Sequence, residues 1–419
     1  MKFNPTLIKS TSIFLSTILI VFSCKDDQSN NDNNEPILRA LSNDEQTIIT
    51  SANDFSFELL KIVSNSYESE NVFISPFSVN AALSMTLNGA NGNTKDSIIY
   101  ALGLEGLSEQ QINQAYLDLT TFLLGLDKKV TFDIANSNWY AENLTLNSAF
   151  RQTLLDYYDA EVRAVDFRDT KTVGIINDWV EEKTNDKIKD LISELDPMII
   201  MVLVNAVYFN AEWTVKFDKD DTQDQLFYLE NGTSIMTPMM HNESTIVTAQ
   251  NDQMRLIDVP YGNGQFRFTI VMSAYSTDNE NYQSLNDIIG GLNSQVLNTL
   301  LENGNEMEMD LYLPKFTFEF KTELREVLEE MGMGIAFTEN ADFKNLFEES
   351  SEASIDEIIH QSYIDVNEKG TEAAAATAIV IKTTSLGPIA NVNQPFAYLI
   401  REQHSNTILF SGKMLNPEE

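Results

Sequence analysis

Residues 71–85, NVFISPFSVNAALSM, decide how this chain folds. The stretch opens with a short apolar run, which indicates a strand, and then passes through Ser75 and Pro76 into a second apolar segment. A proline that follows a serine suits the first turn of a helix, because the amide hydrogen that proline lacks would have no partner there. The sequence therefore predicts a short strand followed at once by a helix that starts near Ser78.

This stretch closely resembles the serpin family, whose second helix begins with the same Ser-Pro-x-Ser pattern. Further blocks that resemble the family occur in its order up to the C-terminus, and LVNAVYF at residues 203–209 is the most specific of them. The other matching segments are 87–90, 136–139, 176–180, 238–240, 260–261, 311–316, 341–343, 395–396 and 410–413. The resemblance covers roughly residues 40–417. It implies an α+β fold with three β-sheets, about nine helices and an exposed reactive-centre loop.

The composition narrows the classes of function. The chain has 419 residues, of which 43% are hydrophobic and 21% charged, so it can bury a sizeable core. Its net charge of −36 argues against nucleic acids and anionic lipid surfaces as electrostatic partners. Basic partners are favoured instead.

The N-terminus resembles an export signal with a site for lipid attachment. Lys2 and Lys9 supply positive charge, and residues 11–22 form an apolar stretch that is too short to span a bilayer. The stretch ends at Ser23 and Cys24, and Cys24 is the only cysteine, so disulfides are excluded. A small residue followed by cysteine resembles a bacterial lipoprotein signal, with lipidation at Cys24. The alternative is an ordinary signal peptide with an incidental cysteine.

These features divide the chain into three parts. We expect a lipoprotein signal peptide at residues 1–23, a lipid-anchored flexible tether at 24–39 and a serpin domain at 40–419. Residues 25–27, KDD, resemble a surface-export signal of some Gram-negative lipoproteins. We therefore expect an exported protein that is lipid-anchored to a bacterial outer membrane and exposed at the cell surface.

Residues 367–395, NEKGTEAAAATAIVIKTTSLGPIANVNQP, allow two interpretations. On propensity alone, the alanine run favours a helix. With a period of two residues, however, one face is small or apolar throughout, as a strand that enters a sheet requires. The resemblance favours the strand and implies that residues 367–394 are the reactive-centre loop. It assigns the hinge of that loop to Glu368, Gly370, Thr371, Ala373 and Ala375.

The resemblance implies suicide inhibition of serine endopeptidases, and for some members of cysteine endopeptidases. The protease cleaves the loop and forms an acyl-enzyme, and the loop then inserts into the central sheet as a new strand. The inward face of this hinge carries no charge, proline or bulky side chain, and Glu372 lies on the opposite face. We interpret the chain as inhibitory. The alternative is a non-inhibitory serpin that acts as a binding or scaffolding surface lipoprotein.

Two positions are candidates for the residue before the scissile bond. With Glu368 counted as the seventeenth residue before cleavage, the reactive bond lies between Thr384 and Ser385. A small threonine suits elastase-like or subtilisin-like proteases. Lys382 is the alternative and suits trypsin-like proteases, whose specificity pocket carries a carboxylate.

The resemblance also implies polar groups that control insertion. It assigns Ser75, Ser78, Asn205 and His360 to the shutter, a cluster beneath the strands that separate. It assigns Trp213 and Lys315 to the breach, where the loop enters the sheet, and pairs Lys315 with the hinge residue Glu368. Without the resemblance, His360 would be interpreted as a surface histidine and Trp213 as a core aromatic residue.

No motif for catalysis or cofactor binding is present in the sequence. The chain has three histidines and lacks a Ser-His-Asp pattern, metal-ligand spacing and a phosphate-binding loop. Residues 218–224 resemble a calcium loop only loosely. Residues 91–111 lack the basic helix of heparin-activated serpins, so we expect no glycosaminoglycan partner. We expect a monomer without a cofactor or catalytic residues, whose partners are target serine proteases.

Sequencing the fragment that elastase or trypsin releases tests the two scissile-bond assignments. Elastase is expected to cut after Thr384, and trypsin after Lys382, because their pockets select small and basic side chains respectively. A cut outside residues 381–385 contradicts both assignments.

Overall fold

The computed structural model describes Met1 and residues 36–349, 353–371 and 387–419. The chain divides into two units, and the following concerns the second, Asn34–Glu419. The expected signal peptide and its lipid-attachment residue, Cys24, lie outside the described residues.

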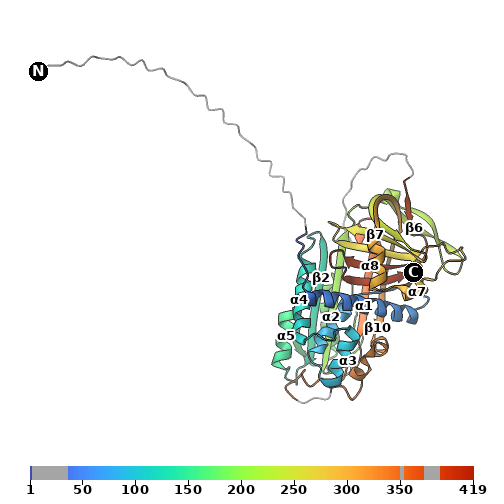
Figure 1. Ribbon diagram of the computed structural model, residues 1–419. Helices are drawn as coiled ribbons and strands as arrows, with labels where there is room; N and C mark the ends of the chain where they lie inside the picture. Colours follow the sequence, from blue (N-terminus) through green and yellow to red (C-terminus); the bar gives the residue numbers. More distant parts are fainter. Residues whose placement is uncertain (2–35, 350–352, 372–386) are drawn as a thin grey trace. The chain divides into compact units, whose positions relative to one another are not determined.

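Nine α-helices are present in the described part of the chain (Figure 1). They are α1 (Asn43–Ser66), α2 (Pro76–Leu87), α3 (Gly92–Leu102), α4 (Glu109–Leu124), α5 (Ser148–Tyr158), α6 (Lys171–Lys183), α7 (Leu285–Gly291), α8 (Ser294–Glu302) and α9 (Arg325–Leu328). Short 3-10 and π segments occur at Lys219–Asp221, Glu329–Met333 and Gly334–Phe337. The predicted helix after Ser75 begins at Pro76, because the Ser75 hydroxyl caps the helix by accepting from the amide of Ser78.

One six-stranded sheet forms the centre of the fold. Its order is β10-β11-β12-β4-β2-β3. These strands are β10 (Phe316–Glu323), β11 (Ile359–Asn367), β12 (Gly370–Thr371), β4 (Met201–Glu212), β2 (Val130–Ala141) and β3 (Glu161–Val165). On one face, Trp179 of α6 packs edge-to-face on Trp139 of β2. On the other face, Phe77 of α2 contacts Phe132 of β2, so the sheet is covered on both sides.

The remaining nine strands form one sheet that the long strand β6 divides into two groups. Their order is β1-β15-β14-β8-β7-β6-β9-β13, and β5 also pairs with β6. The strands are β1 (Val72–Ile74), β5 (Gln223–Tyr228), β6 (Ser234–Gln250), β7 (Met254–Tyr261), β8 (Phe266–Ser273), β9 (Asn305–Pro314), β13 (Ile389–Asn391), β14 (Phe396–Glu402) and β15 (Ile408–Met414).

The division follows from how β6 pairs along its length. Only residues 247–250 of β6 pair with β7, whereas residues 234–239 pair with β5 and residues 239–248 with β9. These two groups and the six-stranded sheet correspond to the three sheets that the sequence predicts, and the α+β class is confirmed.

The C-terminal strand also terminates the first helix. Lys413 of β15 is fully buried, and its Nζ donates to the carbonyl oxygens of Ser64, Tyr67 and Glu68 at the end of α1. These carbonyls have no partner within the helix, and a cation there also complements the helix dipole. Burial lowers the pKa of Lys413 to about 8.

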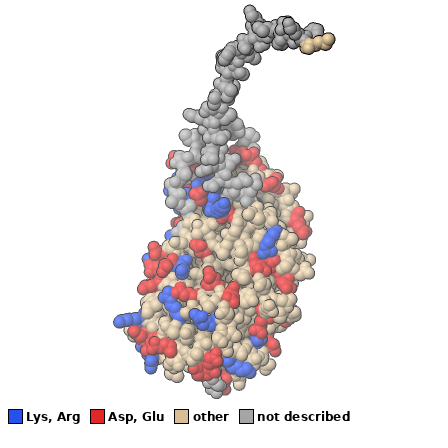
Figure 2. Space-filling model, turned by 90° about the vertical axis from the view of Figure 1, so that its left-hand side faces the viewer, with Lys and Arg blue, Asp and Glu red and all other residues tan. Residues whose placement is uncertain are grey.

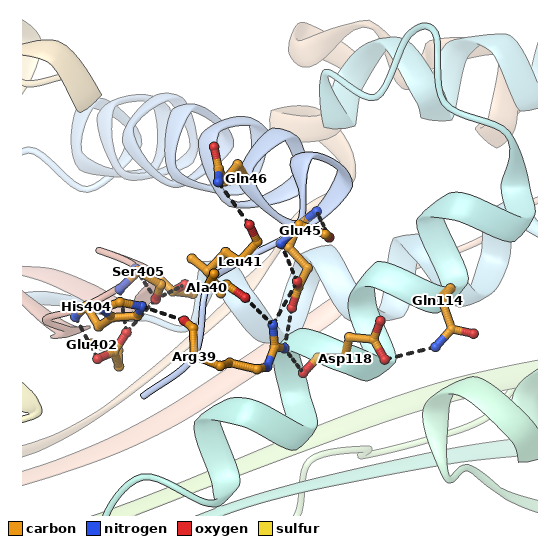
Figure 3. Close-up of polar contacts among 12 residues, drawn as sticks. Arg39, Ala40, Leu41, Glu45, Gln46, Gln114, Asp118, Glu402, His404 and Ser405 are labelled. Carbon is orange, nitrogen blue, oxygen red and sulfur yellow. Dashed lines mark hydrogen bonds and ion pairs between the residues drawn. The ribbon is translucent and has the colours of Figure 1, made fainter. Parts of the chain in front are cut away.

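Arg39, near the beginning of this unit, contacts two of its helices (Figure 3). Arg39 forms a two-pronged ion pair with the buried carboxylate of Glu45 in α1, in which Nη1 lies 2.9 Å from Oε2. Arg39 also donates to the carbonyl oxygen of Asp118 in α4 at 3.0 Å, and its own carbonyl lies 2.9 Å from Nε2 of His404. Arg39, which the sequence predicts as the last residue of the tether, therefore makes side-chain contacts within the unit Asn34–Glu419.

The pKa of Glu45 reflects this contact. Burial alone would raise the pKa, but hydrogen bonds from Arg39 and from the capping residue Ser42 outweigh it and hold the pKa below its ordinary value. Glu45 is therefore an ionised, buried side chain whose charge is stabilised by Arg39 and by the hydrogen bonds from Ser42.

Replacing Arg39 with alanine is expected to lower the free energy of unfolding by about 1–3 kcal/mol, because Glu45 is left buried without its cation. The matched control is Lys61→Ala, which removes an exposed ion pair with Glu58 and should change the free energy by less than about 0.5 kcal/mol. Urea unfolding midpoints measure both. Equal effects of the two variants would contradict the importance of the Arg39 contact.

Candidate functional site

The central sheet contains a gap between two neighbouring strands. Over residues 201–210, β4 pairs with β2, and over residues 359–365, β11 pairs with β10. Among the described residues, β4 and β11 do not pair with each other, and only the two-residue strand β12 lies between them. We call the space between β4 and β11 the sheet gap.

A cavity of about 450 Å³ continues the sheet gap away from β12. Residues 201–206 of β4 and 359–361 of β11 both line it, so it lies where the two strands face each other. Apolar side chains make up much of its lining, including Val79, Ala82, Leu83, Ile188, Leu191 and Leu203. Because strand edges carry unpaired amide and carbonyl groups, this space can accept a further strand.

The first two residues of the predicted hinge strand already occupy one end of the sheet gap. Gly370 pairs with Glu212 of β4 and with Asn367 of β11, and Thr371 pairs with Ala211 and Val366. A Cβ atom on Gly370 would lie 1.9 Å from the carbonyl oxygen of Ala211, so only glycine fits this close approach.

Thr371 points into the core. Its side chain is buried, and its hydroxyl oxygen lies 2.6 Å from the hydroxyl of Tyr261. In the period of two that the sequence predicts, Ala373 and Ala375 share this inward face with Thr371. Ala373 and Ala375 themselves lie outside the described residues.

Trp213 holds the turn that joins β11 to β12. Its indole Nε1 donates to the carbonyl of Asn367 and its backbone amide donates to the carbonyl of Lys369, both at 2.9 Å. The indole stacks on Tyr261 with ring centroids 4.4 Å apart. Trp213 is therefore both a core aromatic residue and a hydrogen-bond donor at the predicted breach.

The predicted ion pair at the base of the loop is formed. Lys315 Nζ lies 3.2 Å from Oε2 of Glu368, and the hydroxyl of Thr222 donates to Oε1 of the same carboxylate at 3.2 Å. Burial alone would raise the pKa of Glu368, but its hydrogen bonds, including those from Lys315 and Thr222, hold the pKa below its ordinary value. Glu368 is thus an anionic anchor for the turn before β12.

The four predicted shutter residues join one buried hydrogen-bond network. The amide of Ser75 donates to Nε2 of His360 at 3.0 Å, and the Ser75 hydroxyl accepts from the amide of Ser78 at 3.3 Å. The Ser78 hydroxyl donates to the side-chain carbonyl of Asn205. Helix α2, strand β4 and strand β11 are therefore linked beneath the sheet gap.

Asn136 extends this network and is a residue that sequence reasoning did not assign to the site. It accepts from Nδ2 of Asn205 at 2.5 Å and donates to the carbonyl of Tyr158 at 2.6 Å. The available signal was a pair of asparagines, Asn136 and Asn138, on a strand face whose earlier residues are apolar. Tyr261 was likewise missed, because its contact with Thr371 joins distant segments of the chain.

His360 is held neutral by its surroundings. It is buried, and burial lowers its pKa to about 4. Acceptance of the Ser75 amide hydrogen by Nε2 also requires that this nitrogen be unprotonated. The interpretation of His360 as a surface histidine is therefore wrong.

The predicted reactive bond lies beyond what the structure describes. Lys382, Thr384 and Ser385 are outside the described residues. The chain is described again from Gly387, and residues 389–391 form β13, which pairs in parallel with β9. Both ends of the predicted loop, residues 370–371 and 389–391, thus belong to sheets.

The described residues contain no group of three or more His, Cys, Asp or Glu side chains that could hold a metal ion. Among the same residues, no helix combines the length and apolar character that a membrane span requires.

Comparison with known proteins identifies the family. The model of the family Serpin (serine protease inhibitor) matches residues 50–417. This chain belongs to the serpin family, and the predicted fold is confirmed.

The relatives include proteins with different functions. An uncharacterized serpin-like protein of Thermococcus kodakarensis is 31% identical, over 90% of this chain and 87% of the relative. Human corticosteroid-binding globulin is also 31% identical, over 90% of this chain and 92% of the relative. The crystal structure of a thermophilic serpin, tengpin, in the native state has a TM-score of 0.80 and 31% identity, and covers 92% of this chain and 98% of that chain.

Acid titration tests the position of His360. Its pKa is lower in the folded state, about 4, than the ordinary value of 6.5, so the unfolded state binds more protons between these two pH values. The contribution of His360 to the free energy of unfolding is therefore fully present above about pH 6.5. It falls as the pH is lowered towards about 4, by up to about 1.4 kcal/mol per pH unit.

When the pH is lowered from 7 to 5, the free energy of unfolding of the wild-type chain should fall by on the order of 1–2 kcal/mol more than that of a His360→Asn variant. Asparagine has no group that titrates in this range. Urea unfolding midpoints at the two pH values measure this difference. Equal losses in the two proteins would show that His360 is not held neutral.

Proposed function

We propose that this chain inhibits serine endopeptidases, and some cysteine endopeptidases, by suicide-substrate trapping. A protease cleaves the loop at Thr384–Ser385, or after Lys382, and becomes acylated by it. The loop then adds to the central sheet as a strand and carries the protease with it. Members of this family are generally not enzymes themselves, so the chain serves as a substrate that its target does not release.

The observation that carries this proposal is the sheet gap with β12 at one end. β12 pairs with β4 and β11 at once, so the strand that the loop would extend has already begun in register. The inward side chain of Thr371 sets the face on which the following small residues would enter. Among the described residues, no ladder between β4 and β11 would have to break to accept them.

Insertion is favourable on simple energetic grounds. A new central strand adds on the order of ten backbone hydrogen bonds, each worth about 0.5–1.5 kcal/mol net. Burial of Ile379 and Ile381 on the predicted inward face adds about 1.5–3 kcal/mol for each side chain. Together these terms are comparable to or larger than the ordinary stability of a domain, which supports a mechanism driven by insertion.

The excess of acidic residues in this chain favours one class of target protease. The chain carries 63 acidic and 27 basic residues, and acidic side chains are spread over the face that Figure 2 shows. Such a surface attracts basic proteins and speeds their association. The proposed targets are elastase-like, subtilisin-like and trypsin-like proteases with positively charged surfaces.

We also propose a location at the cell surface. The lipoprotein-like N-terminus, with Cys24 as the lipidated residue, would hold the inhibitor as a monomer at a bacterial outer membrane. There it would protect the cell from secreted or foreign proteases. Palmitate labelling that is lost in a Cys24→Ser variant would support this location.

A non-inhibitory role is the second candidate, favoured by the 31% identity with corticosteroid-binding globulin. In that case the chain would act as a binding or scaffolding surface protein. The small, uncharged inward face of the hinge argues against this role, because it meets a requirement that only insertion imposes.

Incubation with pancreatic elastase, subtilisin and trypsin, followed by a denaturing gel, tests the proposal. The wild-type chain is expected to form a complex that survives the detergent, and the cleaved chain should resist heat better than the intact one. Ala375→Glu should be cleaved without forming the complex, because its charge would enter the core with the inward face.

The matched control is Ala374→Glu, which places the same charge on the opposite face of the predicted strand. It should retain at least part of the trapping. Quantitative cleavage of the wild-type chain without any complex, and without a gain in heat stability, would favour the non-inhibitory candidate.

A further inference from the structure

Strand β13 is attached to the rest of the protein by a short ladder. It consists of three residues, Ile389–Asn391, and among the described residues it pairs with β9 alone. On either side of this ladder, the amide of Asp310 donates to the carbonyl of Pro388 at 3.0 Å, and the amide of Val392 donates to the carbonyl of Tyr312 at 2.9 Å. Strand β14, by contrast, has seven residues and pairs with strands on both sides. β13 is therefore easier to detach than β14.

A cation from another strand binds β13 directly. Arg255 lies on β7, and its Nη2 donates to the carbonyl oxygen of Ile389 at 3.3 Å. This contact joins the two groups of strands that β6 separates, because β7 belongs to one group and β13 to the other. Arg255 therefore supplies a donor on the side of β13 that has no strand partner among the described residues.

Arg255 has no acidic partner among the described residues. Its side chain is half-buried, burial lowers the pKa of the guanidinium, and no described carboxylate forms an ion pair with it. Removal of a cation from water is unfavourable unless the cation gains other partners. The carbonyl of Ile389 is the acceptor that Arg255 gains in the described structure.

His241 of β6 supports the same ladder from the other side of β9. Its Nε2 donates to Oδ1 of Asp310 at 2.9 Å, and its ring stacks on Tyr312 with ring centroids 4.4 Å apart. These two β9 residues are the ones whose backbone groups bond to the residues that flank β13. Glu243 lies opposite Asp310 in the register of β6 and β9, so without His241 the carboxylate would face another acid. His241 therefore fixes the part of β9 that holds β13.

The attachment of β13 limits what an uncleaved loop can do. In the register of β12, Ile381 would lie opposite Met201 at the far end of the sheet gap, about 33 Å from β12. β13 lies beyond the other end of the gap, because β9 leads into Lys315, the partner of Glu368. Residues 382–388 would have to cover the return, and they span at most about 25 Å. An uncleaved loop therefore cannot fill the whole sheet gap while β13 stays paired.

We propose that Arg255 and the His241–Asp310 pair lock β13 in place, and that this lock sets how long the uncleaved chain stays able to trap a protease. Arg255 contacts the strand directly, whereas His241 is a positioning residue that acts through Asp310. Once β13 is released, the uncleaved loop can enter the sheet gap, and the chain no longer offers a bond to its target. The consequence for trapping rests on the proposed function, whereas the lock rests on the described contacts.

Amide hydrogen exchange of the peptide that contains β13 tests the lock. Arg255→Met keeps an apolar stem but removes the donor to Ile389, so exchange at β13 should be about fivefold faster than in the wild-type chain. Arg255→Lys keeps a cation and should restore much of the protection. Exchange at β14 and the unfolding temperature should not change in either variant, because a general loss of packing would alter both.

A double-mutant cycle tests the role of His241. His241→Phe keeps the ring that stacks on Tyr312 but removes the donor to Asp310, and it should also speed exchange at β13. Asp310→Ala should have a similar effect, and the double variant should exceed neither single variant, since both changes remove one contact. The matched control is Lys95→Ala, which removes an ion pair with Glu109 far from β13 and should leave its exchange unchanged.

The lifetime of the trapping-competent chain tests the consequence. The wild-type chain and Arg255→Met are held at one temperature below the unfolding transition, and samples taken over time are mixed with trypsin or pancreatic elastase. The variant should lose complex formation about fivefold faster, while its mass remains that of the uncleaved chain and its unfolding temperature rises. Unchanged exchange at β13 in Arg255→Met overturns the proposal, and so do equal lifetimes of the two chains.

Failure of the proposed function gives a different result. In that case neither chain forms a detergent-stable complex at any time, whereas exchange at β13 is still faster in Arg255→Met than in the wild-type chain and in the Lys95→Ala control.

Discussion

The backbone hydrogen bonds that β4 and β11 do not make with each other are the constraint on which the rest of this structure depends. A sheet normally satisfies every internal amide and carbonyl, and an unfilled position in its centre leaves two rows of such groups without strand partners. Among the described residues, only Gly370 and Thr371 fill that position, and a cavity of about 450 Å³ continues it. The described part of the sheet therefore has room for a further strand at its centre.

Two polar assemblies hold the sheet in this state from opposite ends. At the entrance, Trp213 and Lys315 bind the turn before β12 through hydrogen bonds and an ion pair. Beneath the strands, Ser75, Ser78 and Asn205 connect α2 to β4, and His360 of β11 joins them through the Ser75 amide. Buried polar groups must keep their hydrogen-bond partners. Such networks therefore favour a few discrete arrangements of β4 and β11 over a continuous range of separations between the two strands.

Charge acts on this surface over distance. The chain carries 63 acidic and 27 basic residues, and such an excess of carboxylates attracts basic proteins and speeds their association. This is the electrostatic basis of the class of target that we propose.

Much of the fold and of the site can be predicted from the sequence, because short stretches of neighbouring residues carry the signals. Ser75-Pro76 marks a helix start, LVNAVYF a buried strand, and the small residues after Gly370 a strand that can enter a sheet. The order of such blocks was enough to predict the α+β fold and the residues of both polar assemblies. The roles of Asn136 and Tyr261 were not predictable in this way. Their contacts join segments from 22 to 110 residues apart, and the burial of a side chain on a strand depends on which face the other elements cover. Folding in three dimensions settles that choice, because a period of two leaves both faces available until the sheet is packed.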